Sequence, residues 1–202
     1  MGLYDRYLAA RVRFAPESLP ETVALVITDR DLLTDGAYAT LESFLSWAFT
    51  FDAKRVVVYV SISDENVGPT IQREITSLSA PHPLAVRTPE DESRATEPIQ
   101  VSIGLGGKAE FATAVRGIAG AVATGELEPD EITEADVEEQ LVFPTDPDLI
   151  LKTGAERLSD FMIWQSVYSE LYFTDVNWQN FRRRDYLRAL RDFQTRQRRF
   201  GE

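Results

Sequence analysis

The sequence predicts a single α/β domain over residues 1–202, in which a central, mostly parallel sheet is flanked by helices. Two observations support this fold class. Short apolar segments rich in β-branched residues alternate with longer segments of helical periodicity. The apolar segments lack an exposed polar face, which is typical of parallel strands covered on both sides. A chain of this length buries about 70% of the surface that its unfolded form exposes, so one core is the default.

The first half of the chain opens with a predicted amphipathic helix in residues 1–15, where apolar and aromatic residues recur at helical spacing. The apolar runs 22–28 and 55–62 predict buried strands, and a helix is expected between them at 36–49. A short helical stretch at 71–78 and a strand at 84–87 follow. Residues 88–97, TPEDESRATE, have the composition of a surface loop.

The second half continues the alternation of strands and helices. Strands are predicted at 98–104, 148–152 and 170–174, and helices at 108–124, 134–141, 160–168 and 181–197. The helix at 108–124 is rich in alanine. The last helix alternates arginines with apolar residues at helical spacing, and it belongs to a C-terminal helix and tail that span 180–202.

The chain is strongly acidic, with a net charge of −12 and only three lysines among 21 basic residues. An acidic, lysine-poor surface indicates adaptation to high salt, where ions screen the self-repulsion of the chain. A binding face for basic partners is the alternative interpretation. The balance argues against nucleic acid, which requires clustered basic stripes.

Residue types exclude several kinds of chemistry. The chain has no cysteine, so disulfides and thiolate chemistry are excluded, and its single histidine, His82, lies between prolines in an expected surface loop. No run approaches the roughly 18 apolar residues of a spanning helix. These observations predict a cytoplasmic protein.

A cluster of cationic and hydroxyl groups follows the predicted strand at 148–152. Lys152, Gly154, Arg157 and Ser159 lie within eight positions, and the glycine allows the backbone to approach a ligand closely. Lys152 supplies a point charge, whereas Arg157 can grip phosphate oxygens with its planar fork. The cluster therefore suits a diphosphate. A helix capped by Ser159, with solvated charges, is the alternative interpretation.

The segment DPDLILKTGAERLSDFMIWQSVYSELYFTD, residues 146–175, closely resembles the C-terminal signature of the cis-prenyltransferases, the undecaprenyl and dehydrodolichyl diphosphate synthase family. Relative to that pattern, Lys152 replaces an arginine, Ala155 a glycine and Asp160 an asparagine, and one residue is missing before Arg157. Arg199 and Gly201 reproduce the terminal R-x-G of the family.

The resemblance implies roles for these residues. Lys152, Arg157 and Ser159 would bind the diphosphate of isopentenyl diphosphate, and Glu170 would be a carboxylate linked to Mg²⁺. Arg199 and Gly201 would contact an active site across a dimer. The polyprenyl product would be a lipid, which allows contact with a membrane surface. From its own sequence surroundings, Glu170 is as compatible with a surface carboxylate as with a metal ligand.

The front half departs from the family pattern D-G-N-x-R-W, which cradles the allylic diphosphate. Only the aspartate is retained, as Asp29, a possible catalytic remnant, and it is followed by Arg30 and Asp31. Asp31 and Asp35 oppose a multiply charged anion by the sign of their charge. The helix that walls the product tunnel in the family is also shorter here.

Three hypotheses follow from this combination. The lost cradle and the retained R-x-G resemble the non-catalytic, Nogo-B-receptor-type subunits of heteromeric cis-prenyltransferases, which implies an accessory subunit paired with a catalytic cis-prenyltransferase. The complex would extend an allylic diphosphate with isopentenyl diphosphate. The second hypothesis is a self-sufficient, atypical homodimeric synthase, and the third is a scaffold that kept the fold without the chemistry.

Overall fold

The protein contains one six-stranded sheet in which every strand is parallel to its neighbours. A computed structural model describes residues 2–91, 93–154, 162 and 164–196. The strands are β1 (Thr22–Thr28), β2 (Arg55–Ser61), β3 (Leu84–Arg87), β4 (Ile99–Ile103), β5 (Leu149–Thr153) and β6 (Glu170–Thr174). They lie in the order β3-β4-β2-β1-β5-β6. The predicted α/β class is confirmed.

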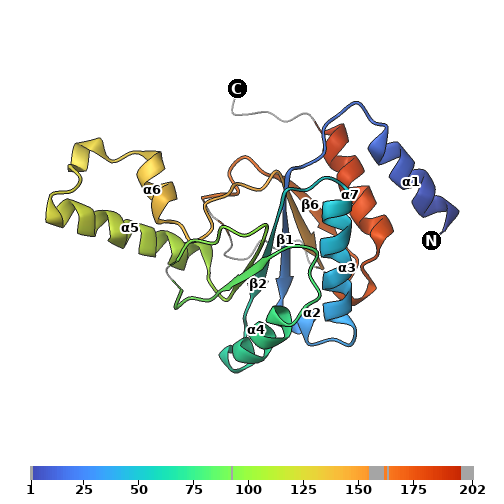
Figure 1. The fold of residues 1–202 in the computed structure, drawn as a ribbon, viewed down its shortest axis with the longest axis horizontal. Coiled ribbons are helices and arrows are strands. Elements are labelled where there is room, and N and C mark those ends of the chain that lie inside the picture. Colours follow the sequence, from blue (N-terminus) through green and yellow to red (C-terminus); the bar gives the residue numbers. More distant parts are fainter. Residues whose placement is uncertain (1, 92, 155–161, 163, 197–202) are drawn as a thin grey trace.

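One face of the sheet carries a layer of helices (Figure 1). These helices are α1 (Leu3–Arg13), α3 (Ala37–Thr50), α4 (Gly68–Thr76) and α7 (Arg183–Thr195), and all four contribute buried side chains to the larger hydrophobic cluster. The short helix α2 (Asp29–Leu32) connects β1 to this layer. Side chains at alternate strand positions point into the cluster, as the period of two requires.

The opposite face holds a smaller cluster, and from this side α5 (Gly107–Thr124) and α6 (Glu134–Gln140) extend away from the sheet as an arm (Figure 1). The two helices pack closely at Gly117, which lies against the Gln140 side chain. A Cβ at Gly117 would overlap the end of that side chain, which is exposed and would have to move aside.

The structure corrects two details of the sequence prediction. Residues 164–168 form hydrogen-bonded turns rather than the predicted helix at 160–168, of which residues 160, 161 and 163 lie outside the described part. The Ser169 hydroxyl donates to the Pro147 carbonyl at 2.6 Å, and β6 begins at the next residue. Helix α2 was not predicted; a capping box between Thr28 and Asp31 starts it.

The predicted surface loop at 88–97 is a loop, exposed at most of its described positions, that is anchored to the body of the protein. Ala95 is buried, and its N–H donates to the Val142 carbonyl at 2.9 Å. The Arg87 guanidinium donates to the carbonyls of Ser93 and Arg94. An acidic composition therefore did not reveal the backbone partners of this segment.

The aromatic cluster between α3 and α7 should make a large contribution to stability. Phe44 makes edge contacts with Trp178 at 6.1 Å and Tyr186 at 5.4 Å between ring centroids, and the Trp178 indole N–H donates to the Ala37 carbonyl. We expect Trp178→Ala to lower the free energy of unfolding by about 3–5 kcal/mol. Chemical denaturation measures this change. Leu33→Ala is the control, because Leu33 is 56% exposed and its loss should cost about 0.5 kcal/mol or less.

Candidate functional site

The carboxyl ends of β1 and β5 meet at the switch point of the sheet. The strands are neighbours, yet β1 leads to β2 on one side and β5 leads to β6 on the other. Loops that leave adjacent strands in opposite directions open a crevice between them, and ligands of parallel α/β sheets bind there. This position follows from strand order alone.

Three consecutive residues at the end of β5 present groups that an anion would satisfy. Lys152 is buried, and burial lowers the pKa of its ammonium group, an effect that the nearby Asp31 carboxylate opposes. The Thr153 hydroxyl is buried and has no hydrogen-bond partner among the described residues. Gly154 has a φ of 78°, and the space beside its Cα is open. A buried cation and an unpartnered hydroxyl are costly without a ligand.

Two further polar residues, which the sequence analysis missed, stand on the same face and at the same level as Lys152. The register pairs Val26 with Lys152 and with Tyr59, and Tyr59 with Ser102. Tyr59 and Ser102 are both buried. Residues at every second position of a strand point to the same face, so alternation could have indicated the orientation of Tyr59 and Ser102. Only the strand order aligns the two residues with Lys152.

Asp29 does not present a free carboxylate at this edge. Its Oδ2 accepts hydrogen bonds from the N–H groups of Ser63 at 2.7 Å and Asp64 at 3.2 Å, and its Oδ1 accepts from the Arg30 N–H at 2.8 Å. The side chain is buried. Asp29 therefore ties the end of β1 to the residues that follow β2.

Glu170 lies at the amino ends of the strands, opposite the end that carries Lys152. It opens β6 opposite Leu149, four residues before Thr153, which corresponds to a separation of about 13 Å along the strand. Its carboxylate pairs with the Arg196 guanidinium at 3.3 Å. The fold thus separates Glu170 from Lys152 and Asp29 within one chain.

Glu170, the predicted Mg²⁺-linked carboxylate, and Asp29 consequently do not form a magnesium site together within a single chain. Mg²⁺ prefers octahedral oxygen ligands, whereas Asp29 is saturated at Oδ2 by two N–H groups and Glu170 is remote and paired with a cation. Among the described residues, no group of three potential metal-binding side chains was found. Arg157, Ser159, Arg199 and Gly201 lie outside the described residues, so their predicted roles stay predictions.

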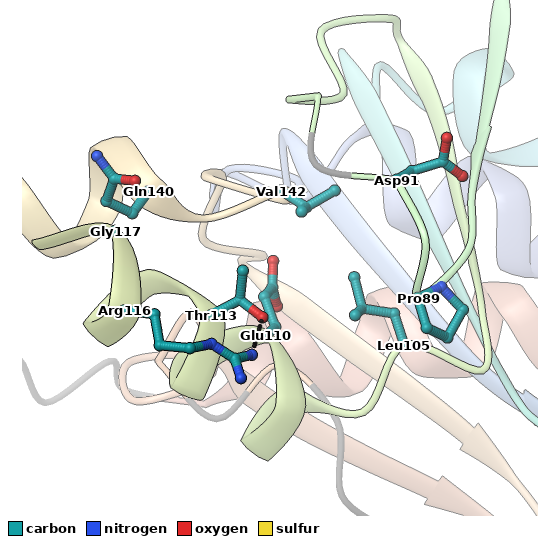
Figure 2. Close-up of a pocket in the computed structure, with 9 residues that line it drawn as sticks. All are labelled: Pro89, Asp91, Leu105, Glu110, Thr113, Arg116, Gly117, Gln140 and Val142. Atoms are coloured by element: carbon teal, nitrogen blue, oxygen red, sulfur yellow. Dashed lines mark hydrogen bonds between the residues drawn. The ribbon is translucent and has the colours of Figure 1, made fainter. Parts of the chain in front are cut away.

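A cavity of about 590 Å³ lies at the root of the arm, between α5 and the loop after β3 (Figure 2). Its lining includes Pro89, Asp91, Leu105, Glu110, Arg116 and Val142, and none of those predicted site residues that the structure describes. Glu110 is buried there. Its Oε1 accepts from the Phe143 N–H at 2.9 Å and its Oε2 from the Gln165 amide at 3.2 Å. These bonds connect the arm to the segments before β5 and β6.

Burial raises the pKa of Glu110, and the hydrogen bonds from Phe143 and Gln165 oppose this only in part. The unfolded chain ionises near pH 4.5 while the folded chain retains the proton, so stability falls as the pH rises from 4.5 to the raised pKa. We expect Glu110→Gln to remove this decline. Denaturation midpoints of both proteins measured across this window test it, with exposed Glu131→Gln as the control. Parallel pH curves would contradict the assignment.

Comparisons with known proteins place this chain in a family. Residues 70–201 match a protein family described as "Putative undecaprenyl diphosphate synthase". Isoprenyl transferase 2 of Tropheryma whipplei is 31% identical over 98% of this chain and 94% of its own length. The chain belongs to this family of cis-prenyltransferases.

Archaeal members match a shorter part of the chain at higher identity. The tritrans,polycis-undecaprenyl-diphosphate synthase (geranylgeranyl-diphosphate specific) of Methanocaldococcus jannaschii is 50% identical over 110 residues. That alignment covers 52% of this chain and 39% of the archaeal protein. A Methanopyrus kandleri synthase of the same name is also 50% identical, over 51% of this chain and 39% of its length. The chain thus matches about two fifths of these archaeal synthases.

Solved structures share the fold of this cis-prenyltransferase. Lavandulyl diphosphate synthase from Lavandula x intermedia, solved with dimethylallyl diphosphate, aligns with a TM-score of 0.73 at 24% identity. The alignment covers 91% of this chain and 99% of that structure. A probable undecaprenyl diphosphate synthase from Campylobacter jejuni aligns with a TM-score of 0.67 at 19% identity, with the same coverage. No helix in the described part is long and apolar enough to cross a membrane.

Proposed function

We propose that this chain is a cis-prenyltransferase that extends an allylic diphosphate with isopentenyl diphosphate and works as a homodimer. The end of β5 carries the proposal, because its buried ammonium, unpartnered hydroxyl and open glycine are complementary to a diphosphate at the switch point. The names of the relatives, which are synthases and a transferase, support a catalytic chain over the accessory subunit that the lost cradle suggests.

In this reaction, the bond between the allylic carbon and the diphosphate oxygen breaks, and the diphosphate leaves with the electron pair. The isopentenyl double bond attacks the allylic carbon, and loss of a proton forms the new cis double bond. Lys152 would hold the isopentenyl diphosphate by charge-assisted hydrogen bonds, and the open backbone at Gly154 would let the phosphates approach closely. Their contribution is orientation of the double bond toward the allylic carbon.

A homodimer is supported by an exposed apolar patch beside the outer strand β6. Val167 and Tyr168 are 66% and 61% exposed in the turn that leads into β6. The neighbouring Trp164 stacks on Phe111 of α5, and Val115, one turn farther along α5, is also exposed. Burying large apolar side chains of this kind favours association.

The accessory subunit remains the second candidate, and the β1 end supports it. Asp29 is engaged by three backbone N–H groups, and Asp31 places a further carboxylate at this edge, where an allylic diphosphate would need cations. In that arrangement, a catalytic partner subunit would supply the allylic site and the chain would contribute Arg199 and Gly201.

Incorporation of labelled isopentenyl diphosphate onto farnesyl or geranylgeranyl diphosphate tests these proposals. The assay contains Mg²⁺ and high salt, and uses the chain alone and then mixed with a full-motif synthase from the same organism. Turnover by the chain alone would support the homodimer. Silence alone with stimulation on mixing would overturn it in favour of an accessory subunit. Silence in both, without binding of isopentenyl diphosphate, would favour a scaffold.

A further inference from the structure

Helix α1 is apolar on two opposite sides. Leu8 and Val12 are almost completely buried against the α7 side of the core. Leu3, Tyr7, Ala10 and Phe14 follow one another at spacings of four, three and four residues, which places them on a single stripe on the other side of the helix. Packing of the fold explains the first side only.

The second stripe is open to solvent. Leu3 and Phe14 are 86% and 87% exposed, and Tyr7 is 54% exposed. Figure 1 shows α1 on the outer side of α7. Single exposed apolar residues are common, but an aligned series on one helix indicates an interaction surface.

Arginines border the stripe on both sides. Arg6 precedes Tyr7 on one flank, and Arg11 lies on the other, where its guanidinium stands 5.7 Å from the Tyr7 ring centroid and donates to the Tyr7 hydroxyl. On the neighbouring helix, Arg188 lies 5.8 Å from the ring of Tyr4. Long cationic side chains beside aromatic and aliphatic groups are the pattern of a helix that lies in a membrane interface.

The charge of this region is opposite to that of the whole protein. Helix α1 contains three arginines and one aspartate, and α7 contains four arginines and two aspartates. Those two aspartates are paired, Asp185 with Arg188 and Asp192 with Arg196. On a chain of net charge −12, a basic face would orient the molecule so that α1 approaches an anionic surface.

We propose that the face formed by the α1 stripe and the arginines beside it docks on an anionic phospholipid surface. Leu3, Tyr7 and Phe14 would enter the boundary between headgroups and acyl chains, and the arginines would contact lipid phosphates. A protein partner is disfavoured because the stripe lies on an outer helix with guanidinium groups on both flanks. In an anionic bilayer, lipid phosphates surround each inserted side chain, so both flanks would meet negative charge. The proposal does not depend on catalysis by this chain.

Flotation of the full chain with vesicles, without substrates, tests the proposal. Vesicles of phosphatidylglycerol and phosphatidylcholine in equal parts should bind the protein, and vesicles of phosphatidylcholine alone should bind it much less. The double variant Leu3→Ser, Phe14→Ser should bind about ten-fold more weakly, because it removes the inserted side chains. Ile132→Ser, an exposed apolar residue outside α1, is the matched control and should bind normally.

A charge variant separates the electrostatic attraction to the vesicles from the insertion of apolar side chains. Arg6→Gln should weaken binding to the anionic vesicles about five-fold, whereas Arg73→Gln, on α4, should have little effect. No binding to anionic vesicles, or equal binding by the stripe variant and wild type, would overturn the proposal. Light scattering provides the other decisive result: a protein assembly that dissociates on loss of Leu3 and Phe14, without vesicle binding, would identify a protein interface instead.

Discussion

Lys152→Met is expected to weaken the binding of isopentenyl diphosphate by about 30–100-fold and yet to raise the melting temperature. The loss of affinity reflects one charge-assisted contact in a buried site, worth about 2–3 kcal/mol. The gain in stability arises because the ammonium is buried without a ligand. A methionine fills a similar volume without a charge, and an increase of about 2–4 °C is expected.

The pH dependence of this gain follows from the lowered pKa of Lys152. Below that pKa, the charged lysine destabilises the folded chain relative to the unfolded chain, which holds the proton more tightly. The cost appears as the pH falls from 10.5 through the lowered pKa. The melting difference between variant and wild type should therefore grow as the pH falls from 10.5 through the lowered pKa, and level off below it.

Calorimetric titration with isopentenyl diphosphate and thermal melts provide the two measurements. Lys54→Met is the matched control, because Lys54 pairs with Glu21 at the surface and should change neither quantity appreciably. Unchanged affinity in Lys152→Met would remove the end of β5 from the proposed binding site. Because binding is measured without turnover, the result holds whether the chain is a complete synthase or an accessory subunit.

Asp29→Asn is expected to lower the free energy of unfolding by about 3 kcal/mol, although the substitution is nearly isosteric. Asp29 accepts three N–H groups, two of them at Oδ2. An asparagine has one acceptor oxygen, so in either orientation of the amide an NH₂ group faces a backbone donor. Buried donors without an acceptor cause the loss.

The same substitution distinguishes a structural role of Asp29 from metal binding. If Asp29 is a structural link between β1 and β2, the Asp29→Asn substitution should lower the melting temperature by roughly 6–12 °C, to the same extent with Mg²⁺ and with a chelator. A metal ligand would show a loss only when Mg²⁺ is present. Asp35→Asn is the control, since Asp35 is exposed in the loop before α3 and should leave stability nearly unchanged.

The strands and most helices could be predicted because their determinants are local. The run from Thr22 to Thr28 is apolar at nearly every position, so only a strand buried on both faces accommodates it. The predicted helix at 160–168 was wrong over 164–168, where the run is amphipathic but forms turns. There, Gln165 is engaged by Glu110 and Phe143, residues far away in the sequence.

The chemistry at the end of β5 was also visible in the sequence, because Lys152, Thr153 and Gly154 are consecutive. Asp29 shows what was not visible. Its partners Ser63 and Asp64 lie 34 and 35 positions away, and they reach it only because β1 and β2 are paired in register. Its match to the aspartate of D-G-N-x-R-W suggested a catalytic remnant, whereas the fold uses both of its oxygens for backbone contacts.

By itself, the sequence determined most of the secondary structure, the α/β class and the diphosphate-binding run at the end of β5, since each depends on residues that are close along the chain. The tertiary structure decided which of these groups meet. Strand order placed β1 beside β5, and the register of β6 placed Glu170 at the opposite end of the strands from Lys152. Helix packing left one apolar side of α1 exposed. These outcomes depend on pairing between distant segments, which local periodicity does not encode.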